Sequence, residues 1–417
     1  MAEAAATMTP PDAPAASRNP FRVVQYRWYW ASSFLSAMGV GIQIVTVPLY
    51  IRDRVPEDDR ALLIALALVC QSLPAALLIL FGGVAADRFQ RRTILMRVAL
   101  AAAVVSSVYI GLAGTGFDGI WPVFFLGAIV GSCDAFGQPA RGSMVPHIVP
   151  RAALQNGVIL STVAFMSAFQ FLGPAVGGLL ADFASLTVAF IAEVAFLLIG
   201  ALAATRLRPM PLLGTGRSVL ADLRDGLGYV RRTPTIRWLI LFQLLPGMFL
   251  MGPFRVTAVD LVTDVLDASD KFVGLLSSGF GIGVIAGSIM LTIFPIRRRG
   301  LLLCASPIWG GLIFILYGLS EHLAISLALM VPWGLSAASF INMAFPLIQE
   351  NADPARLGRV SSVSNLAFQL ALPLGYAQAG LIATVWGPQS AAITSGVAIA
   401  LLGVLSVAFL QPIRKLR

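Results

Sequence analysis

The sequence predicts an all-α membrane protein with twelve transmembrane helices, which form two pseudo-symmetric bundles of six. The 417 residues are 58% hydrophobic and 12% charged, whereas an average soluble domain is about 25% charged. Long apolar runs, each close to the roughly 20 residues that cross a bilayer as a helix, alternate with short charged breaks. The two halves of the chain also resemble each other, which predicts the division into two bundles.

The apolar runs define the expected spans in order. In the first half they lie near 28–51, 61–86, 93–115, 120–141, 156–182 and 184–206. In the second half they lie near 236–260, 271–295, 300–319, 323–346, 359–383 and 387–410. Because lipid offers the backbone no hydrogen-bond partner, each span is expected to be helical. The bundles are therefore expected over 20–206 and 236–417.

Two segments lie outside these bundles. Residues 1–19, rich in Ala and Pro, lack the basic start and apolar core of a secretory signal, and we expect a disordered tail. The linker 207–235 contains "RSVLADLRDGLGYVRR", where apolar residues recur at helical spacing at Val219, Leu223, Leu227 and Val230. This pattern fits an amphipathic helix on the membrane surface; a solvated linker is the alternative.

Basic residues predict the orientation in the membrane. With the N-terminus placed in the cytoplasm, the 29 Lys and Arg residues fall at cytoplasmic ends, loops and tails, except for Arg52, Arg54, Arg60, Lys271 and, within a span, Arg255. The outer loops instead carry the acids Glu57, Asp58, Asp59, Asp264, Asp267 and Asp270. Because basic loops stay on the cytoplasmic side, we expect both termini in the cytoplasm and a multi-pass protein of the cell membrane.

Composition also excludes several classes of function. The formal net charge is +9, but the arginines cluster at the ends of apolar runs, which indicates a membrane and not a nucleic-acid partner. The three cysteines lie singly in apolar runs, without metal-ligand or disulfide spacing. His147 and His322 fall on opposite sides of the predicted membrane, and no GxxxxGKS loop is present. We therefore expect no metal, no cofactor and no enzymatic activity.

The internal repeat is visible at corresponding places in the two halves. "VPRAALQNGV" follows span four and "ADPARLGRV" follows span ten, while "LGPAVGGLLA" in span five corresponds to "LPLGYAQAGLIA" in span eleven. Duplicated six-helix units are typical of carriers, whose substrate site lies at mid-membrane between the halves. We expect a monomer that binds a small molecule.

The turn after span two, "GGVAADRFQRRTILM", resembles the motif Gly-x-x-x-Asp-Arg-x-Gly-Arg-Arg of the major facilitator superfamily. The matching residues are Gly83, Asp87, Arg88, Arg91 and Arg92, and Gln90 stands where the family has Gly. "FRVVQYRWYWASSFLSAMGVGIQIVTVPLY" and "GQPARGSMVPHIVPRAALQNGVIL" resemble the enterobactin-exporter and macrolide-efflux branch, that of drug:proton antiporters. The resemblance covers essentially the whole chain.

In that family the turn is a latch that closes the cytoplasmic side, so the resemblance implies that Asp87 is its key residue. A carboxylate here can meet the positive N-terminal end of span eleven, near Arg359 to Ser362. Arg141 at the end of span four is a further candidate partner. The arginines can bind anionic headgroups, and the alternative is that these charges are only topology signals.

Span five carries a second motif, with Gly173, Pro174, Gly177 and Gly178. It resembles the family's antiporter motif, which implies export. A proline removes one backbone hydrogen bond and bends a helix, and glycines let a neighbouring helix approach closely. Packing alone is the alternative explanation.

Polar stripes predict which helix faces line the transport path. Span one carries Ser32, Ser36, Gly39, Gln43 and Thr46 at intervals of about one turn, and span eleven carries Ser362, Asn365, Gln369, Pro373 and Tyr376. The predicted cavity residues are Ser36, Gln43, Gln170, Gln243, Asn342, Asn365, Gln369 and Tyr376. Uncharged polar residues on one face should point at water or substrate; interhelical hydrogen bonds are the alternative.

Two carboxylates within spans are candidates for proton coupling. Asp134 shares a stripe with Gln138 and Arg141 in span four, and Glu193 lies near the middle of span six. Desolvation favours the protonated form of a carboxyl group, which can then carry a proton across. Asp134 is the first candidate and Glu193 the second; a fixed ion pair of Asp134 with a neighbouring arginine is the alternative.

These features predict a proton-coupled exporter of small amphipathic molecules, such as drugs or siderophore-like metabolites. An apolar cavity with amides and aromatics such as Trp28, Trp30 and Phe34 suits bulky cargo. The alternatives are an importer or facilitator of the same fold and, from other classes, a membrane-embedded enzyme or a non-transporting receptor or scaffold.

Overall fold

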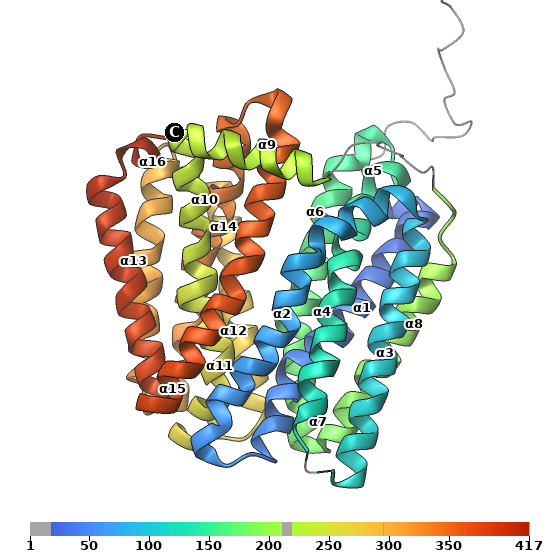
Figure 1. The fold of residues 1–417 in the computed structure, drawn as a ribbon, viewed down its shortest axis with the longest axis vertical. Coiled ribbons are helices and arrows are strands. Elements are labelled where there is room, and N and C mark those ends of the chain that lie inside the picture. The colour runs from blue at the N-terminus through green and yellow to red at the C-terminus, as the bar shows by residue number, and fades with distance from the viewer. Residues whose placement is uncertain (1–17, 118, 211–218, 295, 417) are drawn as a thin grey trace, which may run out of the picture.

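Two helical bundles lie side by side and diverge toward one end (Figure 1). The computed structural model describes residues 18–416 apart from 118, 211–218 and 295. Most of the predicted tail and part of the linker therefore lie outside the described residues. Within the described residues the chain is almost entirely helical, as predicted.

The N-terminal bundle contains the first six spans. The long helices are α1 (Val24–Arg52), α2 (Glu57–Arg88), α3 (Arg91–Thr115), α4 (Trp121–Gly142) and α8 (Leu186–Thr205). Span five is composite: α6 (Leu154–Ser167), the π-helical turn η3 (Ala168–Leu172) and α7 (Gly173–Phe183). Short elements at one end are η1 (Pro20–Arg22), α5 (Val145–Ile148) and η2 (Arg151–Ala153).

The C-terminal bundle repeats this plan. Span seven consists of α10 (Pro234–Pro246), the π-turn η4 (Gly247–Met251), α11 (Gly252–Asp260) and the π-turn η5 (Leu261–Val265). The other spans are α12 (Lys271–Ile293), α13 (Arg299–Gly318), α14 (Leu323–Asn351) and α15 (Leu357–Phe409). Shorter elements are α9 (Val219–Arg232), η6 (Pro354–Arg356) and α16 (Gln411–Arg414).

The described residues contain eleven helical segments that are long and apolar enough to cross a membrane. The last of them, α15, has 53 residues and is two helices joined at Gly387, whose φ of 84° is left-handed and favours glycine. Spans eleven and twelve therefore meet at this residue, close to the predicted boundary. The predicted twelve-helix fold is confirmed.

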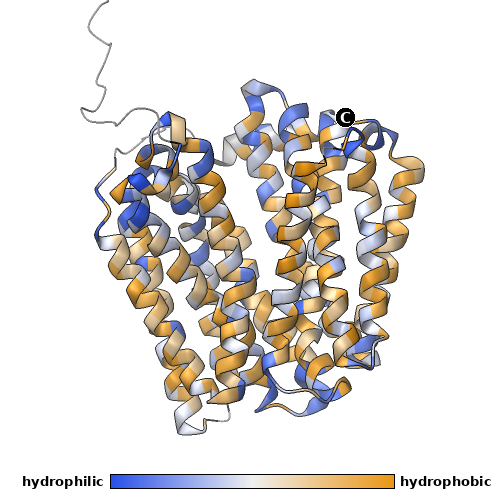
Figure 2. Cartoon of the chain, turned by 180° about the vertical axis from the view of Figure 1, so that it is seen from behind, coloured by the Kyte–Doolittle hydropathy of each residue, from blue (hydrophilic) through white to orange (hydrophobic). Residues whose placement is uncertain are grey.

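The outer surface of the bundles is apolar along most of their length. Figure 2 shows hydrophobic residues along the helices and hydrophilic residues gathered toward the two ends. Large side chains such as Phe125, Leu202 and Leu401 are about 60% exposed. Contiguous exposure on this scale is not tolerated in water, and it is expected where lipid surrounds the helices.

The two ends of the molecule differ. The terminal face, defined by α5, α9 and α16, carries the C-terminus, and the first described residues join it through Arg18, whose carbonyl oxygen accepts a 2.9 Å hydrogen bond from Asn156 (Figure 1). The other end is called here the opposite face. At the opposite face the bundles touch, because Gly380 of α15 lies against Ala61 and Ala65 of α2.

The linker contains a helix, α9, that packs on the start of span eleven. A Cβ at Gly226 would lie 2.9 Å from the carbonyl oxygen of Arg359, and Asp225 forms an ion pair with Arg359 at 3.2 Å. Val230 is buried, whereas Leu227 is exposed. α9 therefore lies across the terminal face of the C-terminal bundle.

Candidate substrate cavity

A cavity of about 1650 Å³ lies between the bundles. It is lined from the N-terminal bundle mainly by α1, α2, α4 and span five, and from the C-terminal bundle by span seven, α12, α14 and α15. All eight predicted cavity residues line it: Ser36, Gln43, Gln170, Gln243, Asn342, Asn365, Gln369 and Tyr376. At the terminal face the lining includes Asp87, Leu223 and Ser362, so the cavity begins where the bundles diverge.

The two polar stripes behave differently. In span eleven Ser362, Asn365, Gln369 and Tyr376 line the cavity, and only Pro373 is packed away from it. In span one Ser32, Gly39 and Thr46 are packed against protein, so their predicted cavity position is wrong. Ser36 and Gln43 lie on the edge of the stripe that faces the cavity, whereas Ser32 and Gly39 lie on the other edge, against α8.

The middle of the cavity wall is built by two π-turns that each precede a Gly-Pro pair. η3 ends before Gly173 and Pro174, and η4 ends before Gly252 and Pro253. Since proline has no N–H to donate one turn back, the helix widens locally at this point, and such bulges are frequent at functional sites.

Matching helix crossings hold the two bulges in place. A Cβ at Gly173 would lie 2.6 Å from Cα of Gly41, and a Cβ at Gly252 would lie 2.7 Å from Cα of Gly375. Span five thus crosses span one as span eleven crosses span seven. Only glycine permits backbones to approach this closely, so the internal repeat extends to the packing around the cavity.

Charged side chains are few in the cavity lining, which contains Asp87, Arg88, Asp134, Arg141 and Arg255. The rest of the wall is apolar or carries amides and hydroxyls. In the described part of the chain, no group of three or more His, Cys, Asp or Glu side chains could hold a metal ion.

Asp134 and Arg141 face each other in the N-terminal wall. Their charges attract each other. Every distance between a guanidinium nitrogen of Arg141 and a carboxylate oxygen of Asp134 is nevertheless longer than the 4.0 Å limit of an ion pair. The guanidinium of Arg141 instead lies 4.4 Å from the ring centre of Phe165, and its carbonyl oxygen accepts a 3.1 Å hydrogen bond from Tyr29. The alternative of a fixed Asp134 ion pair is not formed in this conformation.

Glu193 lies elsewhere, within the packing of the N-terminal bundle. It is 1% exposed, accepts a hydrogen bond from the hydroxyl of Ser106 on α3, and does not line the cavity. Its other oxygen has no partner among the described residues. Its place near the middle of span six is as predicted, but α8 turns it toward α3 and away from the cavity in this conformation.

The C-terminal wall offers amide groups to the cavity. Ser364 donates a 2.6 Å hydrogen bond to Oε1 of Gln243, and Nε2 of Gln243 has no partner among the described residues. Asn342 donates to the hydroxyl of Ser288 at 2.9 Å. A buried amide donor without a partner is costly, and Nε2 of Gln243 lies behind the cavity surface in this conformation.

The turn motif lies open at the mouth. Asp87 is half-buried, lines the cavity and has no ion pair within the described chain; the predicted contact with span eleven or Arg141 is absent in this conformation. Arg88 is exposed at the mouth, and Arg92 donates to the carbonyl oxygen of Leu207 at 3.0 Å. Arg91 is 3% exposed, which does not fit headgroup binding.

Gln90, where the family has glycine, has its own role. Its amide donates to the carbonyl oxygen of Met210 at 3.1 Å and accepts from the N–H of Met210 at 3.0 Å. This two-way pairing ties the turn to the beginning of the linker. The difference from the family pattern is therefore accommodated by a specific contact.

The glycines of span five pack on both bundles. Gly177 lies against Ile42 of α1, and a Cβ at Gly178 would lie 3.1 Å from the carbonyl oxygen of Asp270 in the other bundle. A Cβ at Gly274 would lie 2.2 Å from the carbonyl oxygen of Pro174. This motif thus forms part of the seal at the opposite face.

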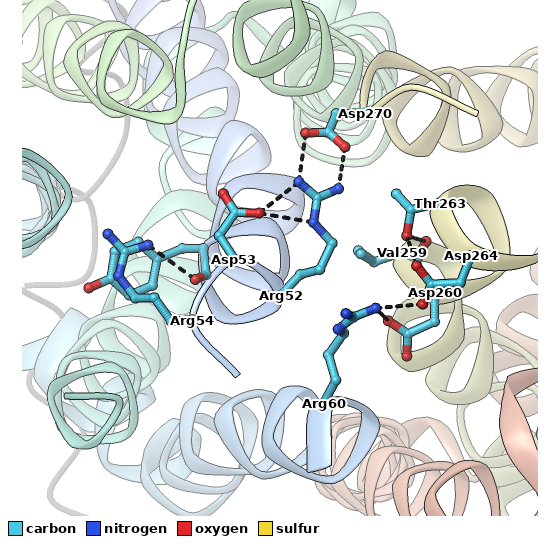
Figure 3. Close-up of polar contacts among 10 residues, drawn as sticks. Arg52, Asp53, Arg54, Arg60, Val259, Asp260, Thr263, Asp264 and Asp270 are labelled. Atoms are coloured by element: carbon cyan, nitrogen blue, oxygen red, sulfur yellow. Dashed lines mark hydrogen bonds and ion pairs between the residues drawn. The ribbon is translucent and has the colours of Figure 1, made fainter. Parts of the chain in front are cut away.

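Ion pairs between the bundles complete this seal (Figure 3). Arg52 of α1 binds Asp270 through both carboxylate oxygens, and Arg60 of α2 binds Asp260 and Asp264. A third pair, not drawn in the figure, joins Lys271 to Asp182 at 3.1 Å. Several of these charges are largely buried, and removing one partner would leave the other uncompensated.

Arg255 is the charged cavity residue to which the sequence assigned no role. It was recognised only as a charge within a span, although an ionisable residue there is by default a functional candidate. Its Nη2 donates a 2.6 Å hydrogen bond to Oε1 of Gln170 in the other bundle. A comparison of the two Gly-Pro segments would have indicated a role for Arg255. Arg255 follows Gly252-Pro253 closely, and the polar residue Gln170 closely precedes the corresponding pair Gly173-Pro174.

Comparison with known proteins confirms the family that the motifs indicate. Residues 29–376 and 257–416 match the model of the Major Facilitator Superfamily. The chain is 24% identical over 398 residues to macrolide efflux protein A of Streptococcus pyogenes, covering 93% of this chain and 96% of that protein. It is 23% identical over 399 residues to the enterobactin exporter EntS of Shigella boydii, covering 94% and 93%.

Solved structures share the fold at low identity. The nucleoside transporter NupG has a TM-score of 0.73 at 12% identity, covering 93% of this chain and 99% of NupG. A bacterial homologue of the human lysosomal transporter Spinster, in an inward-facing and unoccupied conformation, has a TM-score of 0.70 at 15% identity, covering 94% and 96%. The chain is therefore a multi-pass membrane transporter and belongs to the major facilitator superfamily.

Proposed function

We propose that this transporter exports small amphipathic molecules from the cell by alternating access, in exchange for protons, and that it works as a monomer. The observation that carries the proposal is one large cavity, mostly apolar and lined by both bundles, with amides and a carboxylate on its walls. Such a wall suits bulky cargo of mixed polarity, and the efflux proteins among its relatives support the outward direction.

Alternating access here means that the bundles rock about the cavity. The distribution of basic residues supports a cytoplasmic position for the terminal face, and the conformation described above is then open to the cytoplasm and sealed outside. The closing of the mouth brings the Asp87 turn to the first turn of α15, while the ion pairs and the glycine contacts at the opposite face separate.

Asp134 is the proposed coupling residue. It lines the cavity and has no ion pair with Arg141, so a cargo and a proton can compete for the same region. Each proton that moves down 100 mV carries about 2.3 kcal/mol, which is the driving force for expulsion. The burial of Glu193 away from the cavity supports Asp134 over Glu193 in this role.

The test is a compound panel in an efflux-deficient host, with and without a protonophore. Expression of the transporter is expected to lower the accumulation of amphipathic compounds, and the protonophore is expected to abolish this effect. Accumulation that rises on expression and does not depend on the gradient would instead identify a facilitator or importer and refute the proposal.

Replacement of Asp87 by asparagine is expected to slow transport, because it removes the charge that attracts the N-terminal end of α15. A carboxylate at a helix N-terminus contributes about 0.3–2 kcal/mol, so the closed-mouth population should fall by up to roughly thirtyfold. Initial efflux rates in vesicles measure the effect, with Asp58→Asn at the opposite face as the matched charge control. Equal rates in the two variants would exclude a latch at Asp87.

A further inference from the structure

Arg255 is an uncompensated cation in the inner part of the cavity. Of the other charged lining residues, Asp87 and Arg88 lie at the mouth, and Asp134 and Arg141 face each other in the N-terminal bundle. Arg255 forms no ion pair with an acid in the described chain. Its guanidinium donates instead to the neutral amide oxygen of Gln170.

The acids nearest along the chain are already bound to another arginine. Asp260 lies five residues beyond Arg255, where it pairs with Arg60, and Asp264 pairs with the same guanidinium. The ring of Phe169, 5.8 Å from the Arg255 guanidinium carbon, gives only weak cation–π stabilisation. A half-buried guanidinium with five N–H donors therefore retains unused donors that face the cavity.

We propose that Arg255 is the anchor of an anion subsite, and that the preferred cargo is an amphipathic organic anion whose carboxylate, sulfonate or phenolate binds this guanidinium. The inference rests on the proposed function and specifies its substrate class. A guanidinium matches a carboxylate or sulfonate with two parallel hydrogen bonds, and the apolar wall accepts the rest of the molecule.

The position of the subsite links cargo binding to both bundles. Arg255 follows the π-turn η4 and Gln170 lies in the π-turn η3, so the hydrogen bond between them crosses from one bundle to the other. An anion that binds through Nη2 as well as an unused nitrogen of the guanidinium displaces Gln170 from this hydrogen bond. Cargo binding therefore weakens the hydrogen bond between Arg255 and Gln170, which joins the two bundles and must change when they rock.

The test uses two dyes that share a xanthene framework, the anion fluorescein and the cation rhodamine 123. Binding is measured by fluorescence polarisation to the full chain in phosphatidylcholine nanodiscs, whose lipids carry no net charge to compete for the site. Wild-type protein is expected to bind fluorescein more tightly. Arg255→Gln is expected to weaken fluorescein binding by roughly tenfold or more, as for the loss of a charge-assisted hydrogen bond, and to leave rhodamine 123 binding unchanged.

Two further variants make the result specific. Arg255→Lys keeps the charge but loses the planar fork, and is expected to restore much of the fluorescein binding. Arg97→Gln removes an exposed arginine of α3 outside the cavity and should bind both dyes as wild type does. Equal fluorescein binding by wild type and Arg255→Gln, or equal loss of both dyes, would overturn the anion subsite alone. Failure of wild type to bind either dye would overturn the proposed function as well.

Discussion

Replacement of Asp134 by asparagine is expected to abolish gradient-driven efflux while cargo binding remains. Asn keeps the size and polarity of the side chain but cannot release a proton, so the exchange loses its driving ion. Efflux in inverted vesicles, with an imposed proton gradient, should fall to the level seen with a protonophore. Thermal stabilisation by cargo, which reports binding, should stay within about twofold of wild type.

Two comparisons make this result specific to Asp134. Glu321→Gln removes an exposed acid at the opposite face and serves as the charge control. Glu193→Gln tests the second candidate, which lies between α3 and α8 and not in the cavity. Efflux that still follows the gradient in Asp134→Asn would remove this residue from coupling, and its loss in Glu193→Gln alone would transfer the role to span six.

Replacement of Gly274 by valine is expected to prevent closure of the opposite face. The new side chain would meet the backbone carbonyl of Pro174, 2.2 Å from where its Cβ must lie. Overpacking of this kind costs about 1–3 kcal/mol, which shifts the balance between the two conformations by roughly 5- to 150-fold. Transport should fall accordingly, because the cavity no longer opens readily at the terminal face.

The population shift is measured with a reporter cysteine in nanodiscs. Cys70, Cys133 and Cys304 are replaced by alanine, and Ile285, an exposed cavity residue, is replaced by cysteine. Its reaction with a hydrophilic maleimide should be slower with Gly274→Val than without it. Gly111→Val, where a Cβ meets no atom within 4 Å, is the matched control. Equal labelling rates would show that the Gly274–Pro174 contact does not control the conformation.

The fold was predictable because lipid leaves few solutions for an apolar chain. A run of about 20 apolar residues must be a helix, and charged breaks mark its ends, so the predicted spans agree with the helices to within a few residues at most boundaries. What the sequence did not predict lies inside spans five and seven, where π-turns before Pro174 and Pro253 interrupt the helix. Hydropathy carries no signal for such local widening.

Individual side chains were less predictable, because a helix has several faces and sequence shows only their periodicity. Polar type alone identified several residues that line the cavity, such as Gln170 and Gln369. The same pattern misplaced Gly39 and Thr46, since the neighbour on each face of α1 is set by the whole bundle. Glu193 was likewise recognisable as buried, but not as turned toward α3.

The sequence by itself determined that this chain crosses the membrane twelve times, that its halves repeat, and which family motifs it carries. These properties follow from composition and local spacing, which need no knowledge of neighbours. Only the tertiary structure decided that the terminal face is open, that Asp87 has no ion pair with a described residue there, and that Arg255 faces the cavity beside Gln170. Those properties depend on contacts between residues that lie dozens to hundreds of positions apart, and such contacts exist only once the bundles pack together.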